Sequence, residues 1–249
     1  MITLCFMIRD GKHVRELIGS FDPETTVLDA LEILRSGRIV QSGGQTPVPA
    51  YRHSCHHGSC GTCGAIINGL EALMCLTRLG ELASPRPRVP GGPKIEPELD
   101  TDGSVIVRLE HIRRGSLVAG IAARPTQALQ GIPADLPYLM PVGAVAANGK
   151  ANIPGGPPAR VRFEDCIECG LCSSSCPVTV PFMGPAALAA LNRQRQKRPE
   201  TSESMLALAG RPDGAAACER HLACSRVCPQ GIYPGKHIQL LKNALGGKS

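Results

Sequence analysis

The stretch CIECGLCSSSCP, residues 166–177, decides the fold of this chain. Its four cysteines follow the spacing C-x2-C-x2-C-x3-C-P, which bacterial-type ferredoxins use to hold cubane iron-sulfur clusters. In that arrangement the first three cysteines bind one cluster, and the fourth, which precedes the proline, binds a second cluster. The sequence therefore predicts a partner run elsewhere in the chain.

The partner run lies 52 residues downstream, in the stretch CERHLACSRVCP at residues 218–229. It keeps the cysteine spacing, except that His221 stands where the second cysteine is expected. Exchange of the fourth ligands assigns four cysteines to a [4Fe-4S] cluster and leaves three for a [3Fe-4S] cluster. The first set is Cys166, Cys169, Cys172 and Cys228, and the second set is Cys176, Cys218 and Cys224. The alternative is a second [4Fe-4S] cluster in which the His221 imidazole is an extra ligand.

A third group of cysteines, Cys55, Cys60, Cys63 and Cys75, precedes both runs. The order C-x4-C-x2-C followed by a longer gap is the plant-type [2Fe-2S] spacing. Two irons bridged by sulfides need four thiolates around a flat rhomb, so a glycine-rich loop must wrap closely and point its amides at the sulfurs. The alternative, a tetrahedral zinc site, usually comes as two well-separated C-x2-C pairs. Cys5 is left over, alone in a predicted strand, and is expected to be a small buried side chain.

The residues before the first cysteine loop predict two strands and a helix. Apolar and polar residues alternate over 2–8, Asp10-Gly11 supplies a hairpin turn, and a second strand follows near 14–18. Thr26 followed by Asp29 is a helix-capping pattern, apolar residues at 27, 28, 31 and 34 share one helical face, and Gly37 is placed to end the helix. Strand, strand, helix and cysteine loop is the order of a β-grasp, plant-type ferredoxin domain.

Proline-rich stretches divide the chain into three parts. Five prolines at 85–97 precede a strand at 105–109, and a Pro/Gly stretch at 141–158 precedes the cysteine-rich half. Pro185, placed to start a helix, and the apolar residues Ile238, Leu241 and Leu245 predict helices in that half. We predict an α+β fold: a plant-type [2Fe-2S] ferredoxin domain at 1–108, a connecting segment at 109–158, and an α-helical bacterial-type ferredoxin domain with the [4Fe-4S] and [3Fe-4S] sites at 159–249.

Composition excludes several other classes of protein. The 249 residues are 43% hydrophobic, which permits packed cores, but the N-terminus lacks an apolar signal-peptide segment and no window has the length of a membrane span. Twelve cysteines in such a chain predict a cytoplasmic, thiol-keeping location rather than a disulfide framework. The net charge of +6 counts each cysteine as neutral, and cluster-bound thiolates cancel it, so we expect no nucleic-acid partner.

With these motifs in this order, the chain resembles the iron-sulfur subunit family of succinate dehydrogenase and fumarate reductase. The similarity covers nearly all of the chain. It includes Arg52-x-Ser54-Cys55, Gly58-x-Cys60-Gly61-x-Cys63, Asn68-Gly69 before Cys75, Cys176-Pro177, Gly184-Pro185 and Cys228-Pro229-x-Gly231-Ile232-x-Pro234. The resemblance implies an electron-transfer role, in which three clusters connect a flavin to a quinone or another redox partner.

The resemblance also implies partner subunits. A flavoprotein subunit with FAD interconverts succinate and fumarate, and a membrane anchor subunit or another electron-carrier subunit exchanges electrons at the other end. The chain is then a non-catalytic electron-transfer subunit of a tricarboxylic acid cycle oxidoreductase complex, peripheral on the cytoplasmic face of the membrane. We expect no catalytic residue, because nothing places a nucleophile or an acid-base pair beside His56, His57 or His221.

An electron-transfer subunit of a related soluble flavin-dependent oxidoreductase, such as a thiol-dependent fumarate reductase, is the alternative. The family usually has a tryptophan just after the pair equivalent to Cys176-Pro177, whereas this chain continues with Val178 and Thr179. The family also tends to have a basic residue or histidine at the position of Glu219. Both departures lie where a quinone docks in the family, and they favour the alternative slightly.

Overall fold

The computed structural model describes residues 1–37, 47–84, 93–125, 132 and 166–246. Spatial contacts divide the chain into two compact units. Unit 1 consists of Met1–Gln127, Ile167–Cys176 and Arg226–Pro229, and unit 2 consists of Ala128–Cys166, Pro177–Ser225 and Gln230–Ser249. Most of the connecting segment predicted at 109–158 lies outside the described residues, which stop at 125 and include only Ile132 beyond it.

Unit 1 begins with the predicted hairpin. Strands β1 (Ile2–Asp10) and β2 (His13–Phe21) are antiparallel, with Asp10 opposite His13. The two-residue turn between them needs a residue with positive φ, and Gly11 has a φ of 62°. Strand β5 (Val105–Glu110), which was also predicted, pairs in parallel with β1. These contacts place β1 at the second position of a five-stranded sheet with the order β2-β1-β5-β3-β4.

The remaining two strands of this sheet connect the cysteine loop to its last ligand. Strand β3 (Gly64–Ile67) starts directly after Cys63, and β4 (Leu70–Leu73) leads into the short 3-10 helix η1 (Met74–Leu76), which contains Cys75. The Asn68 side chain joins their turn to β5, because its Nδ2 donates to the Ile106 carbonyl over 3.0 Å and its Oδ1 accepts from the Arg108 amide over 2.7 Å. The hairpin therefore fixes Cys63 and Cys75 relative to the sheet.

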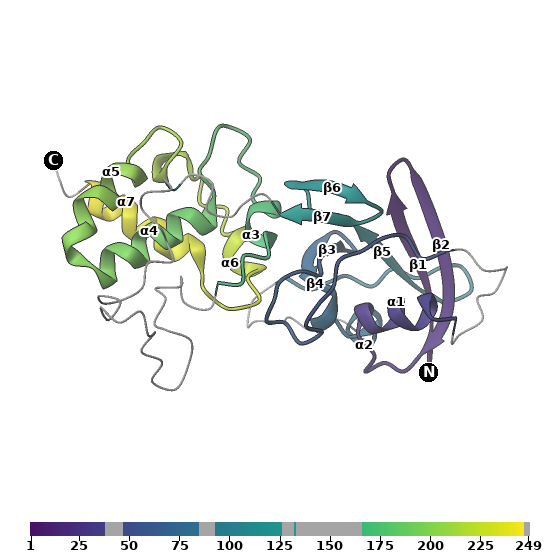
Figure 1. The fold of residues 1–249 in the computed structure, drawn as a ribbon. Helices are drawn as coiled ribbons and strands as arrows, with labels where there is room; N and C mark the ends of the chain where they lie inside the picture. Colours follow the sequence, from purple (N-terminus) through teal and green to yellow (C-terminus); the bar gives the residue numbers. More distant parts are fainter. Residues whose placement is uncertain (38–46, 85–92, 126–131, 133–165, 247–249) are drawn as a thin grey trace, which may run out of the picture. The chain divides into compact units, whose positions relative to one another are not determined.

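Helix α1 (Val27–Arg35) covers this sheet, together with the short helix α2 (Leu79–Ala83) (Figure 1). The Thr26 hydroxyl accepts from the Asp29 amide over 3.1 Å and donates to the Asp29 carboxylate over 2.8 Å, which confirms the predicted cap. The apolar face of α1 is buried in the core of unit 1, and Gly37, with a φ of 68°, follows the helix as predicted. The opposite face of α1 carries the polar residues that reach the cysteine loop.

A second sheet in unit 1 was not predicted from the sequence. It consists of β6 (Gly115–Ala119) and β7 (Ala122–Pro125), which form an antiparallel hairpin. Every residue from Ser116 to Ala119 is exposed, so β6 lacks the alternation of buried and exposed positions that marks a strand in sequence. The hairpin is attached to the approach to the cysteine loop, because the Ile121 and Ala122 amides both donate to the Ala50 carbonyl.

The C-terminal half is helical, as predicted. The short helix α3 (Leu171–Ser174) belongs to unit 1, and the others are α4 (Pro185–Lys197), η2 (Pro199–Thr201), α5 (Ser202–Ala209), η3 (Ala215–Ala217), α6 (Ala223–Arg226) and α7 (Pro234–Gly246). Helix α4 starts at Pro185 as expected, because proline suits the first turn of a helix. Leu188 and Leu191 of α4, Met205 of α5, and Ile238 and Leu241 of α7 form the core of unit 2. None of the helices in the described part of the chain is long and apolar enough to cross a bilayer.

Candidate metal centre

The four cysteines predicted to bind a [2Fe-2S] cluster meet in pairs in unit 1. The side chains of Cys55 and Cys60 are hydrogen-bonded to each other, and those of Cys63 and Cys75 form a second such pair. The pairs also interact with one another, since Cys60 acts electrostatically on Cys63 and Cys55 acts on Cys75. The loop and the 3-10 helix η1 thus bring all four sulfurs together.

Backbone amides surround these sulfurs. The His57 amide hydrogen bond is the largest cause that lowers the pKa of the Cys55 thiol to about 5, and the Cys60 amide also donates to it. The Gly58 amide donates to Cys75, and the Thr62 amide donates to Cys60 Sγ over 3.5 Å. Within the second pair, the hydrogen bond from Cys75 is the main cause that lowers the Cys63 pKa, while the pKa of Cys75 is raised. The thiolate form is therefore favoured at Cys55 by loop amides and at Cys63 by its hydrogen bond with Cys75, whereas Cys75 itself is favoured as the thiol.

This donor set fits a two-iron cluster. Each iron of a [2Fe-2S] cluster takes two thiolates, and the negative sulfurs are stabilised by N–H donors of the surrounding loop. The sulfurs of Cys55 and Cys60 and those of Cys63 and Cys75 form two pairs, beside the amides of the loop.

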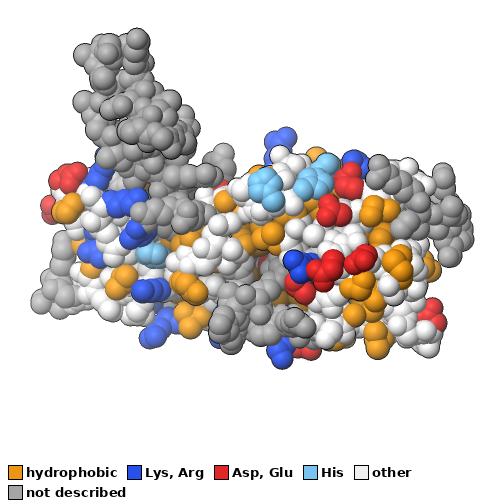
Figure 2. All heavy atoms as spheres, turned by 90° about the horizontal axis from the view of Figure 1, so that it is seen from below, with side chains coloured by type: hydrophobic (Ala, Val, Ile, Leu, Met, Phe, Trp, Pro, Cys, Tyr) orange, Lys and Arg blue, Asp and Glu red, His pale blue; other side chains and the backbone are white. Residues whose placement is uncertain are grey.

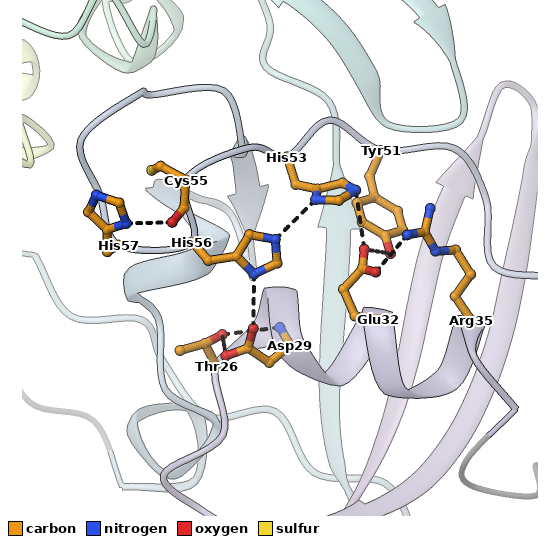
Figure 3. Close-up of polar contacts among 9 residues, drawn as sticks. All are labelled: Thr26, Asp29, Glu32, Arg35, Tyr51, His53, Cys55, His56 and His57. Atoms are coloured by element: carbon orange, nitrogen blue, oxygen red, sulfur yellow. Dashed lines mark hydrogen bonds and ion pairs between the residues drawn. The ribbon is translucent and has the colours of Figure 1, made fainter.

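Hydrogen bonds connect the N-terminal side of this loop to helix α1 (Figure 3). His56 Nδ1 lies 3.2 Å from Asp29 Oδ1, and its Nε2 lies 3.0 Å from His53 Nδ1. The other nitrogen of His53 lies 3.4 Å from Glu32 Oε1. His56 has a φ of 60°, which is strained for a residue with a side chain. The two imidazoles thus hold a strained turn next to Cys55 against the helix.

Glu32 is the centre of the second part of this network. It accepts hydrogen bonds from Tyr51 and from Arg35, whose Nη2 lies 2.6 Å from Glu32 Oε2. Burial acts to raise the pKa of Glu32, but these hydrogen bonds outweigh it and lower the pKa below its ordinary value. Figure 2 shows imidazoles gathered beside acidic side chains on one face. His57 points the other way, with Nδ1 on the Cys55 carbonyl and Nε2 2.8 Å from Ser59 Oγ.

The two bacterial-type runs share one backbone conformation at the predicted 52-residue offset. Glu168 and Arg220 both have positive φ, at 51° and 61°. Gly170 and Leu222, the next equivalent pair, also have positive φ, at 78° and 60°, and this conformation is strained for leucine. Helices α3 and α6 also start and end at equivalent residues. Alternating left-handed residues form the amide-lined concavities in which iron-sulfur sites occur, so both runs have a cluster-binding backbone.

Within unit 1, the cysteine before Pro229 is grouped with the first run. The segment Arg226–Pro229 belongs to the same unit as Ile167–Cys176. Val227 packs against the core of unit 1, as do Ile167 and Cys169 of the first run. A cavity of about 330 Å³ is lined by both Leu171 and Cys228. Cys228 therefore lies in the same unit as Cys169 and Cys172 of the first run, and the exchange of the fourth ligands stays a prediction.

The remaining predicted ligands of the two cubane-type clusters are divided between the two units. Cys169, Cys172 and Cys176 lie in unit 1, whereas Cys166, Cys218 and Cys224 lie in unit 2. Cys218 follows η3, Cys224 lies within α6, and the Lys242 ammonium of α7 donates to the Cys218 carbonyl over 2.7 Å. His221 is 46% exposed, and its Nε2 lies 2.9 Å from Glu219 Oε2. The complete ligand sets of the two cubane-type clusters therefore stay a prediction.

Three polar residues that the sequence patterns did not predict attach α3 to the sheet. Glu71 on β4 is 4% exposed at its side chain, and its Oε1 lies 2.7 Å from Arg113 Nη1. The Ser174 hydroxyl donates to Glu71 Oε1 over 3.0 Å and accepts from the Arg113 amide over 2.9 Å. The one available signal was a glutamate inside the short apolar strand LEAL, since a buried carboxylate needs partners.

Two family models match the chain. A model described as a 2Fe-2S iron-sulfur cluster binding domain matches residues 10–108, and one described as a 4Fe-4S dicluster domain matches residues 162–232. The matches confirm the predicted [2Fe-2S] and [4Fe-4S] cofactors and their order along the chain.

Several relatives are similar over most of their length. The chain is 30% identical over 202 residues to the fumarate reductase iron-sulfur subunit of Mycobacterium tuberculosis. The aligned region covers 78% of this chain and 72% of the relative. It is 26% identical over 224 residues to the fumarate reductase iron-sulfur subunit of Escherichia coli, with coverage of 88% and 80%. It is 28% identical over 206 residues to a mitochondrial succinate dehydrogenase [ubiquinone] iron-sulfur subunit of Oryza sativa, with coverage of 80% and 66%.

A solved structure supports the fold. A chain of the Mycobacterium smegmatis Sdh1 complex in the apo form matches with a TM-score of 0.69 at 18% identity, covering all of this chain and 97% of that chain. Together with the family models, this similarity confirms the predicted α+β fold, a strand-rich [2Fe-2S] region followed by a helical ferredoxin region.

Proposed function

We propose, from the premise that this chain belongs to the family of fumarate reductase and succinate dehydrogenase iron-sulfur subunits, that it passes electrons between a flavoprotein subunit and a second redox partner. The observation that carries the proposal is the pairwise assembly of four thiols in one amide-lined loop. Bound iron-sulfur clusters supply reversible one-electron redox chemistry, which no side chain of this chain supplies alone.

The chain's own residues hold the first cluster and adjust its charge. In our proposal Cys55 and Cys60 bind one iron, and Cys63 and Cys75 bind the other, following the two observed pairs. The amides that donate to the sulfurs favour added negative charge, and hydrogen bonds of this kind are one of the factors that set a cluster potential. The contacts of His53 and His56 with α1 keep the loop in place.

The cubane-type clusters are assigned by the two runs. We propose that Cys166, Cys169, Cys172 and Cys228 bind the [4Fe-4S] cluster and that Cys176, Cys218 and Cys224 bind a [3Fe-4S] cluster. The ranges 1–108, 109–158 and 159–249 stay our proposal for the domain borders.

His221 is proposed to remain outside the second of these clusters. Its equivalent in the first run is Cys169, and the residues on either side of both positions have positive φ. The imidazole, however, is longer than a cysteine side chain and is hydrogen-bonded to Glu219 at nearly half exposure. Three thiolates without a fourth ligand suit a three-iron cluster, which supports the [3Fe-4S] assignment.

The partners follow from family membership. We infer a flavoprotein subunit that carries FAD and the succinate or fumarate site, and a membrane anchor or other electron-carrier subunit that receives or supplies electrons. The chain is then peripheral to the membrane, on its cytoplasmic face. The relatives are named as fumarate reductase or succinate dehydrogenase subunits, which does not favour the soluble, thiol-dependent alternative.

We expect the purified, cluster-loaded chain to show no succinate or fumarate turnover alone and to support it only together with a flavoprotein subunit. The reason is that every functional group identified here serves cluster ligation rather than substrate chemistry. Turnover with an artificial electron acceptor, measured with and without the flavoprotein partner, checks this. Sustained turnover by the flavin-free chain contradicts the non-catalytic role, and failure of a cluster-loaded chain to exchange electrons with any flavoprotein contradicts the electron-transfer role.

A further inference from the structure

Two glycines of the [2Fe-2S] loop lie directly against the first bacterial-type run. An added Cβ at Gly61 would lie 2.8 Å from Cys169 Cβ, 2.8 Å from the Ile167 carbonyl oxygen and 3.0 Å from Cys169 Cα. Real Cβ atoms do not approach other atoms so closely, and these neighbours are backbone and a ligand's Cβ rather than the end of a flexible side chain. The backbone at Gly61 is therefore in van der Waals contact with a cysteine assigned to the other cluster.

Gly64 extends the same contact. An added Cβ there would lie 3.1 Å from Leu171 Cδ2 and 3.3 Å from the Cys169 carbonyl oxygen. Leu171 is fully buried in the same hydrophobic core as Cys63 and Cys75. Each glycine directly follows a ligand, since Gly61 follows Cys60 and Gly64 follows Cys63. The two ligand loops thus touch at points one residue away from cluster-bound thiolates.

The contact is held by polar groups that bind no cluster. Ser174, two residues after Cys172, donates to Glu71 of β4 over 3.0 Å and accepts from the Arg113 amide over 2.9 Å. The Glu71 side chain is only 4% exposed, so its carboxylate needs both of its partners. Strand β4 is paired with β3, which begins at Gly64. The attachment of Ser174 to β4 therefore holds α3, and with it the first bacterial-type run, beside Gly61 and Gly64.

We propose that Gly61 and Gly64 are positioning residues for electron transfer, because their lack of side chains allows the [2Fe-2S] and [4Fe-4S] ligand loops to meet at van der Waals contact. This inference rests on the proposed function. In the transfer one electron leaves one reduced cluster and enters the other, oxidised cluster, and no bond is made or broken. Tunnelling weakens steeply with distance, so a methyl group that separates the loops slows the transfer without removing a ligand.

Gly61→Ala in the full, cluster-loaded chain tests the proposal, with Gly103→Ala as its matched control. Both glycines have positive φ, at 71° and 84°, so alanine is strained at both. An added Cβ at Gly103 meets no atom within 4 Å, and Gly103 lies before β5, outside the cysteine loops. The control therefore carries a similar backbone strain without touching a ligand loop.

The readouts are iron and sulfide per chain and the magnetic interaction between the reduced clusters, measured as faster relaxation of the [2Fe-2S] EPR signal when the [4Fe-4S] cluster is also reduced. We expect Gly61→Ala to keep both clusters and lose part of this enhancement, while Gly103→Ala keeps all of it. If Gly61→Ala fails to hold its cluster, Gly64→Ala provides the test, because Gly64 has an ordinary backbone conformation. Undiminished enhancement in a cluster-loaded Gly61→Ala or Gly64→Ala chain, or an equal loss in Gly103→Ala, overturns the proposal. The EPR test uses the chain without a partner subunit. A failed assay with a flavoprotein partner therefore contradicts only the proposed function and leaves this inference to be judged by the EPR result.

Discussion

Replacement of Cys60 by alanine is expected to abolish the [2Fe-2S] EPR signal and to lower the iron content by about two per chain, while the other clusters remain. Cys60 forms a pair with Cys55 and accepts a hydrogen bond from the Thr62 amide. Loss of its thiolate therefore leaves one iron with a single thiolate ligand. The ligands of the other clusters come from different loops, and none of them depends on the Cys60 sulfur. Electron exchange with a flavoprotein partner should fall to background, because the proposed electron path includes this cluster.

Cys5→Ala is the matched control for this experiment. Cys5 lies in β1, is 3% exposed, and has its thiol pKa raised to about 11, mainly by burial, so it is not a thiolate at neutral pH. This variant should keep all clusters and differ only slightly in stability. Loss of every cluster from a still-folded Cys60→Ala chain, or loss of the [2Fe-2S] signal from Cys5→Ala, contradicts the assignment.

Replacement of Cys228 by alanine is expected to destroy the [4Fe-4S] cluster, although its neighbour in sequence, Cys224, is assigned to the other cluster. The reason is that Val227, next to Cys228, packs against the same core as Cys169, and that Cys228 shares unit 1 with Cys169 and Cys172. Loss of one of four thiolates opens a cubane corner, so the variant should lose the reduced [4Fe-4S] signal and keep the three-iron signal.

Cys224→Ala provides the reciprocal control, because it is expected to remove the three-iron signal and to spare the [4Fe-4S] cluster. EPR spectra of both variants, recorded after gentle oxidation and again after strong reduction, separate the two clusters. Selective loss of the three-iron signal in Cys228→Ala would show that the fourth ligands do not exchange between the runs.

Local structure was predictable where short-range rules determine it. The Asp10-Gly11 turn, the Thr26 cap and the start of α4 at Pro185 depend on residues within a few positions of each other, and each lies where the sequence predicts. The recurrence of the cysteine run was predicted as a repeat of ligand order, and the structure adds that the backbone repeats too, with positive φ at Glu168 and Arg220. Ligand spacing carries this information because cluster geometry constrains the loop directly.

Long-range contacts were not predictable from the same patterns. The contact of Gly61 with Cys169 joins residues far apart in sequence, and glycine after a ligand cysteine has a local explanation in its positive φ. The attachment of Ser174 to Glu71 and the hydrogen bond of His56 to Asp29 are likewise tertiary contacts without a spacing signal. The β6–β7 hairpin was missed because its first strand is exposed throughout.

The central claim is that eleven cysteines of this chain hold one [2Fe-2S], one [4Fe-4S] and one [3Fe-4S] cluster. Iron and sulfide analysis combined with EPR of the intact chain, isolated without air and oxidised gently, tests it most directly. We predict about nine irons per chain and a three-iron signal in the oxidised state, with both other clusters appearing on reduction. About ten irons with no three-iron signal and nitrogen coupling from His221, or zinc in place of iron, would contradict it.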